Sequence, residues 1–143
     1  MQIGGILESC LYVNDLDAAQ QFYINVLGLR LVERHPTRHL FAQCGRHMLL
    51  IFDPDASDRE NSFLPPHGAK GAGHIAFAVT DREIGRWRTH LENHGIEIEK
   101  EIEWPQGGHS IYFRDPAGNS VELASPLIWH IEETLFEPKL GNL

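Results

Sequence analysis

The sequence predicts an α+β fold built from two copies of one strand–helix–strands unit. The first observation is a repeat at a fixed offset, because two alternating apolar runs, 8–13 and 74–79, are each followed by an aspartate and an amphipathic stretch. The corresponding residues, each pair 66 positions apart, are Glu8 and His74, Val13 and Val79, and Asp15 and Asp81. The second observation is that three further strand-like segments follow the helical stretch in both halves. Glu8 and His74 are therefore expected to hold equivalent places in the two units.

The first module is expected to cover residues 6–53. Alternating side chains predict a strand over 6–13. Asp15 suits a helix N-cap and Gly28 a C-terminal stop, so the amphipathic residues between them predict a helix. Three more strands are predicted at 29–34, 39–44 and 47–52, separated by turn residues.

The second module is expected to cover residues 74–124, after a linker over 54–73 that is rich in proline, glycine and charge. Its predicted elements are a strand at 74–79, a helix at 81–93 and strands at 96–103, 109–115 and 119–124. The stretch 115–119, Asp-Pro-Ala-Gly-Asn, is the strongest turn signal in the chain. Residues 125–143 form a tail outside the repeat, so the chain reads as one domain with two modules.

Composition narrows the classes of partner. The net charge of −8 and the scattered basic residues argue against nucleic acid or an anionic membrane as a partner. No apolar run is long enough to span a bilayer, and the first residues do not have the pattern of a signal peptide. Cys10 and Cys44 lack metal-binding or redox spacing and are expected to be reduced thiols. We therefore expect a cytoplasmic protein.

Several segments resemble a known superfamily when they are taken together. The matching residues are 11–16 (LYVNDL), Phe22-Tyr23, Leu27-Gly28, 73–77 (GHIAF) and 112–123 (YFRDPAGNSVEL). They resemble the vicinal oxygen chelate superfamily, which includes glyoxalase I, extradiol dioxygenases, fosfomycin-resistance thiol transferases and bleomycin-resistance proteins. The resemblance covers about residues 6 to 124, and the internal repeat supports it independently.

The resemblance implies two βαβββ modules that form a curved, barrel-like mixed sheet with a metal-binding cleft. It also implies one divalent metal ion (Zn, Ni, Mn or Fe) held by Glu8, His74 and Glu122. Glu8 departs from the histidine often found at its position, and the fourth ligand position falls within 48–51, where no oxygen or nitrogen side chain is present. The expected site therefore has three protein ligands or does not exist.

Strand alternation is consistent with such a site. Glu8 shares a strand face with Cys10 and Tyr12, while His74 and Glu122 share theirs mainly with alanine and serine. Two carboxylates and one imidazole would leave coordination positions on the metal open for substrate or water. The two negative charges of the carboxylates would neutralise the divalent cation and make it a milder Lewis acid than a histidine-rich site would. The ordinary alternative for each residue is structural: a glutamate at a wet strand edge and a hydrogen-bonded histidine.

Two further residues are candidates for catalysis beside Glu122. Tyr112, on the preceding strand, is a candidate donor of a proton or hydrogen bond, and a core aromatic is an equally good interpretation. His109 follows a glycine pair and is a candidate acid or base, with a surface histidine as the alternative. Arg114 either holds the following turn or meets an anionic substrate.

The function expected from these residues is that of a metal-dependent glyoxalase-like enzyme of the lyase or isomerase type. Its substrate would be a small molecule that chelates the metal through vicinal oxygens. Glyoxalase I itself is disfavoured because no cluster of arginines to anchor glutathione is present. The alternatives are an extradiol-type dioxygenase or thiol transferase, and a metal-free sequestering protein like those of bleomycin resistance. A homodimer is expected from the resemblance, with modules paired within or between chains.

Overall fold

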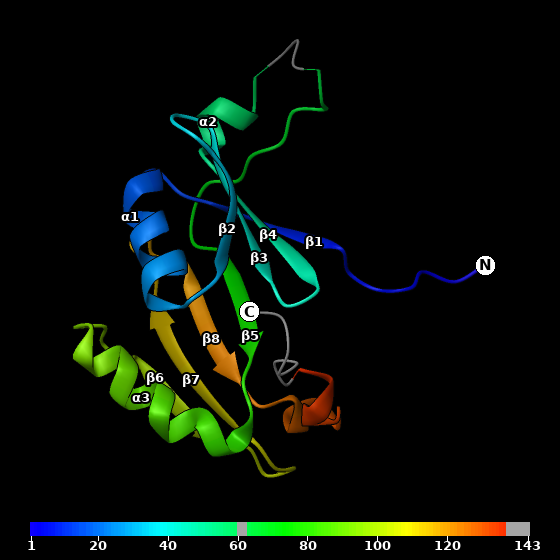
Figure 1. Cartoon of the computed structure of the whole chain (residues 1–143), viewed down its shortest axis with the longest axis vertical. Helices are drawn as coiled ribbons and strands as arrows, with labels where there is room; N and C mark the ends of the chain where they lie inside the picture. The colour runs from blue at the N-terminus through cyan, green and yellow to red at the C-terminus, as the bar shows by residue number, and fades with distance from the viewer. Residues whose placement is uncertain (60–62, 137–143) are drawn as a thin grey trace. The chain divides into compact units, whose positions relative to one another are not determined.

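The computed structural model describes residues 1–59 and 63–136 and has an α+β fold with two four-stranded mixed sheets (Figure 1). The strands are β1 Glu8–Tyr12, β2 Arg30–His35, β3 His39–Cys44, β4 His47–Phe52, β5 His74–Ala78, β6 Lys100–Glu103, β7 His109–Arg114 and β8 Ser120–Ala124. The helices are α1 Leu16–Gln20, η1 Gln21–Val26, α2 Pro54–Ser57, η2 Asp81–Glu83, α3 Ile84–Asn93, η3 Pro126–Trp129 and η4 Glu133–Leu135. The predicted α+β class and its two βαβββ modules are confirmed.

The chain divides into two compact units that follow the two modules. Unit 1 comprises residues 1–73 and 116–118, and unit 2 comprises residues 74–115 and 119–143. Hydrogen bonding between strands runs within two separate sheets, one in each unit, and these sheets do not close into a barrel. The expectation of one barrel-like sheet is therefore corrected to two open sheets.

The sheet of unit 1 has the strand order β1-β4-β3-β2, with β1 parallel to β4 and the other pairs antiparallel. Glu8 lies opposite Met48 in this register, and Cys10 lies opposite Leu50. The inward face carries fully buried apolar residues, which alternate with the residues of the outward face. They include Leu11, Leu40, Ala42, Leu49 and Ile51.

The helix of unit 1 begins where the sequence predicts and changes its winding midway. The Asp15 carboxylate accepts hydrogen bonds from the backbone N–H groups of Asp17 and Ala18, which caps α1. From Gln21 the helix widens into the π form, and the N–H of Leu27 bonds to the carbonyl of Phe22, five residues back. The predicted stop is confirmed, because Gly28 adopts the left-handed backbone (φ 75°) that favours glycine.

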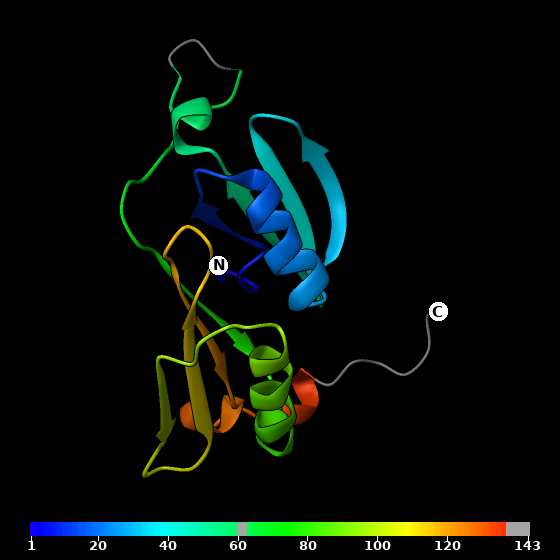
Figure 2. The same cartoon turned by 90° about the vertical axis from the view of Figure 1, so that its left-hand side faces the viewer.

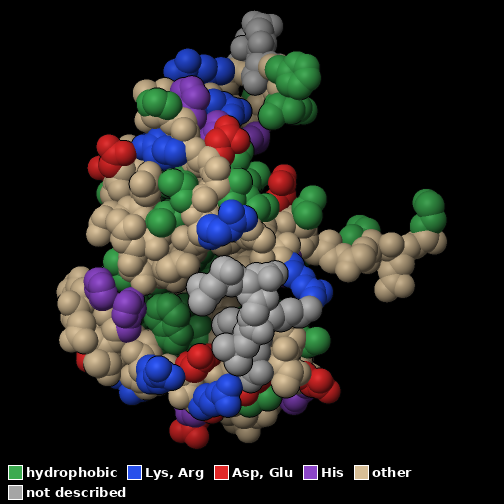
Figure 3. Space-filling model, viewed as in Figure 1, with side chains coloured by type: hydrophobic (Ala, Val, Ile, Leu, Met, Phe, Trp, Pro, Cys, Tyr) green, Lys and Arg blue, Asp and Glu red, His purple; other side chains and the backbone are tan. Residues whose placement is uncertain are grey.

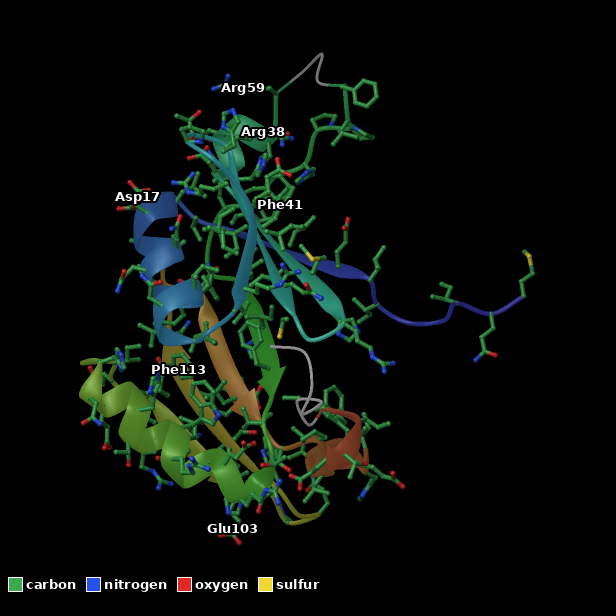
Figure 4. All side chains as sticks on the ribbon, viewed as in Figure 1. Asp17, Arg38, Phe41, Arg59, Glu103 and Phe113 are labelled. Atoms are coloured by element: carbon green, nitrogen blue, oxygen red, sulfur yellow. The ribbon has the colours of Figure 1, made fainter. Side chains whose placement is uncertain are left out.

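The sheet of unit 2 repeats the plan, with the order β5-β8-β7-β6 and β5 parallel to β8. Helix α3 covers one face of this sheet (Figures 1 and 2), and Phe113 projects from β7 on that side (Figure 4). Ile111, Phe113 and Val121 are completely buried there, together with Leu91 from α3. The opposite face carries polar side chains at the positions that the sequence assigned to a site.

Some elements differ from the sequence-based prediction. The strand predicted at 96–103 begins only at Lys100, and the predicted linker contains the short helix α2, whose N-cap is Asp53. In the tail, Ile128 is buried while Trp129 remains mostly exposed, and residues 137–143 lie outside the described part of the chain. No helix within residues 1–59 and 63–136 is long and apolar enough to cross a membrane.

The predicted turn before β8 depends on a buried pair of polar residues. One oxygen of Asp115 accepts the backbone N–H of Asn119, and the other accepts its side-chain amide, both at 2.8 Å. Replacing Asp115 by alanine removes both hydrogen bonds of this buried pair and is expected to cost about 1–3 kcal/mol of unfolding free energy. Urea denaturation measures this cost. The control D17N changes an exposed aspartate, and an equal loss in both variants would contradict the assignment.

Candidate metal and active site

A histidine and a glutamate meet on the open face of the unit 2 sheet. His74 begins β5 and lies opposite Ser120, two residues before Glu122 on β8. The Nε2 atom of His74 is 3.3 Å from Oε2 of Glu122. The Glu122 side chain is only 8% exposed, so its carboxylate requires close polar or cationic partners.

The hydrogen bond on the other side of the His74 ring determines what faces Glu122. Nδ1 lies 3.2 Å from the carbonyl oxygen of Ser120, and a carbonyl only accepts, so Nδ1 must carry the proton. In a neutral imidazole, Nε2 then presents a lone pair to the carboxylate. Two acceptors at this distance are stabilised only by a proton or a cation between or beside them. The pair therefore fits two adjacent ligands of a divalent metal.

Tyr112 holds the second oxygen of the same carboxylate. It lies directly opposite Glu122 in the β7–β8 register and donates its hydroxyl hydrogen to Oε1 at 2.8 Å. Its ring stacks at 22° to that of His74, with centroids 6.4 Å apart. Burial and the Glu122 hydrogen bond raise the pKa of Tyr112, against a smaller lowering by a hydrogen bond with Ser110. Tyr112 is therefore a neutral donor.

A cavity of about 370 Å³ lies on this face, and Tyr112 and Ser120 form part of its wall. Its other lining residues are Glu99, Lys100, Ile102 and Arg114. The Arg114 guanidinium makes two hydrogen bonds, of 3.0 and 3.1 Å, to the Glu99 carboxylate. Arg114 therefore anchors the segment before β6 at the wall of this open hollow, whose lining includes Tyr112 but neither His74 nor Glu122.

The corresponding face of unit 1 is apolar at the key position. Glu8 and Cys10 on β1 are exposed, and the strand begins at Glu8 rather than at the predicted residue 6. Glu8 lies opposite Met48 in unit 1, as His74 lies opposite Ser120 in unit 2. Two residues further along each partner strand, Leu50 of unit 1 is therefore the equivalent of Glu122. Leu50 lies within residues 48–51, the segment where the resemblance implies a fourth ligand.

His109 lies apart from this group. Side chains along β7 alternate between the two faces of the sheet. His109 is therefore on the face of Ile111 and Phe113, which α3 covers, and Tyr112 is on the opposite face. Its Nδ1 pairs with the Asp81 carboxylate at 2.7 Å. The structure therefore brings His74, Glu122 and Tyr112 together on one face and places His109 on the other.

Glu8 belongs to the other unit, so its part in a metal site stays a prediction. Within residues 1–59 and 63–136, no three or more His, Cys, Asp or Glu side chains form a group that could hold a metal ion. Side chains of both charges are interspersed on the face of each unit shown in Figure 3, in line with the scattered basic residues of the sequence.

Strand alternation in the sequence also places Ser110 on the same face as Tyr112. Ser110 lies two positions earlier on the same strand face and is 1% exposed. It accepts a hydrogen bond of 2.9 Å from the indole N–H of Trp104. Alternation places Ser110 beside Tyr112, and that signal was present in the sequence, whereas the indole of Trp104 arrives through a loop that no periodicity describes.

Comparison with known proteins identifies the family. The model of the Glyoxalase/Bleomycin resistance protein/Dioxygenase superfamily matches residues 5–123, and the chain belongs to this superfamily. A crystal structure named lactoylglutathione lyase, from Agrobacterium tumefaciens, has 44% identity and a TM-score of 0.88, covering 92% of this chain and 100% of that one.

Two relatives have different activities in their names. Catechol-2,3-dioxygenase of Bacillus subtilis (strain 168) is 30% identical over 118 residues, which are 79% of this chain and 38% of the relative. Glutathione transferase FosA of Serratia marcescens is 30% identical over 113 residues, 79% of this chain and 74% of the relative. The chain thus spans little more than a third of the dioxygenase, and the family contains lyases, dioxygenases and transferases.

The His109–Asp81 pair predicts a pH-dependent contribution to stability. The hydrogen bond that His109 donates to Asp81 raises the pKa of His109, and Glu103 at the end of β6 (Figure 4) raises it further, while burial and Arg88 lower it. A raised pKa stabilises the fold fully below the ordinary histidine pKa of about 6.5 and progressively less as the pH rises through the folded-state pKa.

We therefore expect D81N to lower the pKa of His109 toward its ordinary value in an NMR titration of the imidazole. The pair is partly exposed, so the loss of stability should be only about 0.5 kcal/mol below pH ~6 and should vanish at alkaline pH. A loss that grows with rising pH would contradict this assignment.

Proposed function

We propose that the protein is a metal-dependent enzyme of the lyase or isomerase type, acting on a small molecule that chelates the metal through vicinal oxygens. The observation that carries this proposal is the pairing of His74 Nε2 with Glu122 Oε2 at 3.3 Å, with the other ring nitrogen and the other carboxylate oxygen already engaged. The high identity to the Agrobacterium lyase across that whole chain supports the choice of reaction class.

The proposed ligands are Glu8, His74 and Glu122, and the proposed ion is Zn²⁺, Ni²⁺, Mn²⁺ or Fe²⁺. This donor set suits borderline and hard divalent ions rather than Cu⁺. When bound, such an ion supplies Lewis acidity toward a carbonyl or hydroxyl oxygen of the substrate. We propose that the protein is a homodimer, and either pairing of modules, within or between chains, is compatible with this ligand set.

The residues on the unit 2 sheet have separable roles in this proposal. Ser120 fixes the orientation of His74 through its carbonyl, and Tyr112 fixes Glu122 through Oε1. The cavity beside Tyr112 receives the substrate. Proton transfer falls to a carboxylate, Glu122 or Glu8, because His109 faces the α3 side of the sheet.

A dioxygenase is the second candidate, because the Bacillus relative is named as one and Tyr112 stands where a pocket acid is needed. Glu8 weakens this candidate, because the usual ligand set of extradiol enzymes has a histidine in its place. The same residue weakens thiol transfer. A metal-free binding protein is disfavoured by the buried carboxylate of Glu122, since such a role gives no reason to place it beside a histidine lone pair.

Metal analysis of protein purified without chelator tests the proposal. We expect one divalent ion per chain, with affinity reduced by more than about 100-fold in E8Q, H74A and E122Q, since even loss of ligand-orienting groups costs about 10–100-fold. The control E103Q removes an exposed carboxylate of the same sheet and should bind normally. A wild-type protein that binds no Zn²⁺, Ni²⁺, Mn²⁺ or Fe²⁺ would overturn the proposal.

Oxygen consumption distinguishes the two enzyme classes. Protein loaded with Fe²⁺ or Mn²⁺ is expected to consume no oxygen with catechols, because Glu8 replaces the second histidine of the dioxygenase ligand set. An oxygen electrode measures this directly. Turnover with catechol that disappears in Y112F and H74A would favour the dioxygenase and would contradict the lyase or isomerase assignment.

A further inference from the structure

Two histidines lie one helical turn apart at the C-terminal end of α3. His90 is in the last turn of the helix, and His94 is its C-cap residue. Side chains four positions apart are neighbours on one side of a helix, and histidines at this spacing can bind one metal ion together. Their ring centroids are 4.4 Å apart, with the ring planes tilted by 44°. Figure 3 shows histidine side chains together on the surface at this end of α3.

The ring of His94 is already oriented as a metal ligand would be. Its Nδ1 lies 2.8 Å from the backbone carbonyl oxygen of His90, and a carbonyl only accepts, so Nδ1 carries the proton. In the neutral imidazole, Nε2 then presents a lone pair. Histidine ligands of metals ordinarily donate their other ring N–H to a carbonyl or carboxylate in this way. His94 is exposed, so ions in solvent have access to its ring.

The surroundings of the pair are compatible with a cation. The aligned peptide dipoles of a helix give its C-terminus a partial negative charge, which favours a positive charge in the last turn. An open hollow of about 330 Å³ beside His90 is lined also by Glu83, Arg86 and Trp87, so the two charged side chains there have opposite signs. This hollow leaves room for the water molecules that would complete the coordination of an ion.

His35 and His39 form another close pair in unit 1, with ring centroids 5.6 Å apart, but their nitrogens are differently engaged. Nδ1 of His39 lies 3.2 Å from Nη1 of Arg38, and Nε2 lies 3.0 Å from the Glu33 carboxylate. His39 is also buried. Because both nitrogens of His39 have partners, this pair does not offer two imidazoles to one ion, and it provides a matched control.

We propose that His90 and His94 together bind one Ni²⁺, Cu²⁺ or Zn²⁺ ion on the surface of unit 2. Neutral imidazole suits these ions, and Cu²⁺ is expected to bind most tightly of the three. Because α3 covers one face of the sheet and the His74–Glu122 pair lies on the open face, this site is separate from the proposed metal centre. With only two protein ligands, it is expected to release its ion during purification and to fill only when metal is supplied.

Calorimetric titration with Ni²⁺ tests the site in the H74A/E122Q variant, which lacks two ligands of the proposed metal centre. We expect one Ni²⁺ per chain, with affinity reduced at least about tenfold by adding H90Q or H94Q, because each removes one of the two ligands. The control H35Q removes a histidine of the other close pair and should leave the affinity unchanged. Absence of Ni²⁺ binding, or binding that neither H90Q nor H94Q weakens, would overturn the inference.

NMR of the indole groups locates the ion in the otherwise wild-type chain. The ring of Trp87 meets that of His90 edge-on, with centroids 5.3 Å apart, and the other tryptophans are Trp104 and Trp129. Ni²⁺ is paramagnetic and broadens nearby signals, so we expect it to broaden the indole N–H signal of Trp87, which is assigned by its loss in W87F. H94Q should remove this broadening and leave the response of Trp104 and Trp129 unchanged. A Trp87 signal that Ni²⁺ does not broaden, or broadens equally in H94Q, would overturn the inference.

Discussion

The structure of unit 2 depends on how one buried carboxylate is satisfied. Glu122 lies in the interior strand β8, between the parallel partner β5 and the antiparallel partner β7, with 8% of its side chain exposed. Burying this charge is unfavourable unless both oxygens have partners. The strand register supplies them, because it sets Tyr112 of β7 directly opposite Glu122 and His74 of β5 opposite Ser120, two residues earlier on β8. The order and register of β5, β8 and β7 therefore determine both the sheet and the partners of the Glu122 carboxylate.

The repeat and its alternation were sufficient to predict most of the fold. Glycine and aspartate signals located the helix ends at Asp15 and Gly28, and the turn at Asp115 was also evident. The π form of η1 was not predictable, because the apolar spacing of residues 16–27 fits an α-helix as well. The length of β6 was overestimated for a similar reason, since alternation continues beyond the residues that find a strand partner.

The site was predictable in part. Alternation and the repeat gave His74, Tyr112 and Glu122 the correct strands and a common face. His109 was a candidate only because an imidazole can act as an acid or a base. Strand alternation puts Tyr112 and Ser110 on one face of β7, and it therefore puts His109 on the other face, which α3 covers. The contact between the Trp104 indole and Ser110 could not be predicted, because loop geometry brings the two together and no sequence period describes it.

The presence of Leu50 where the other half has Glu122 bears on how such a chain arises. Both halves retain the same backbone pairing, with Leu50 and Glu122 at matching points of their sheets. Duplication of an ancestral segment followed by change at single side chains would leave this pattern. The two halves share one scaffold, and Glu122 gives unit 2 a carboxylate at the point where unit 1 has an apolar side chain.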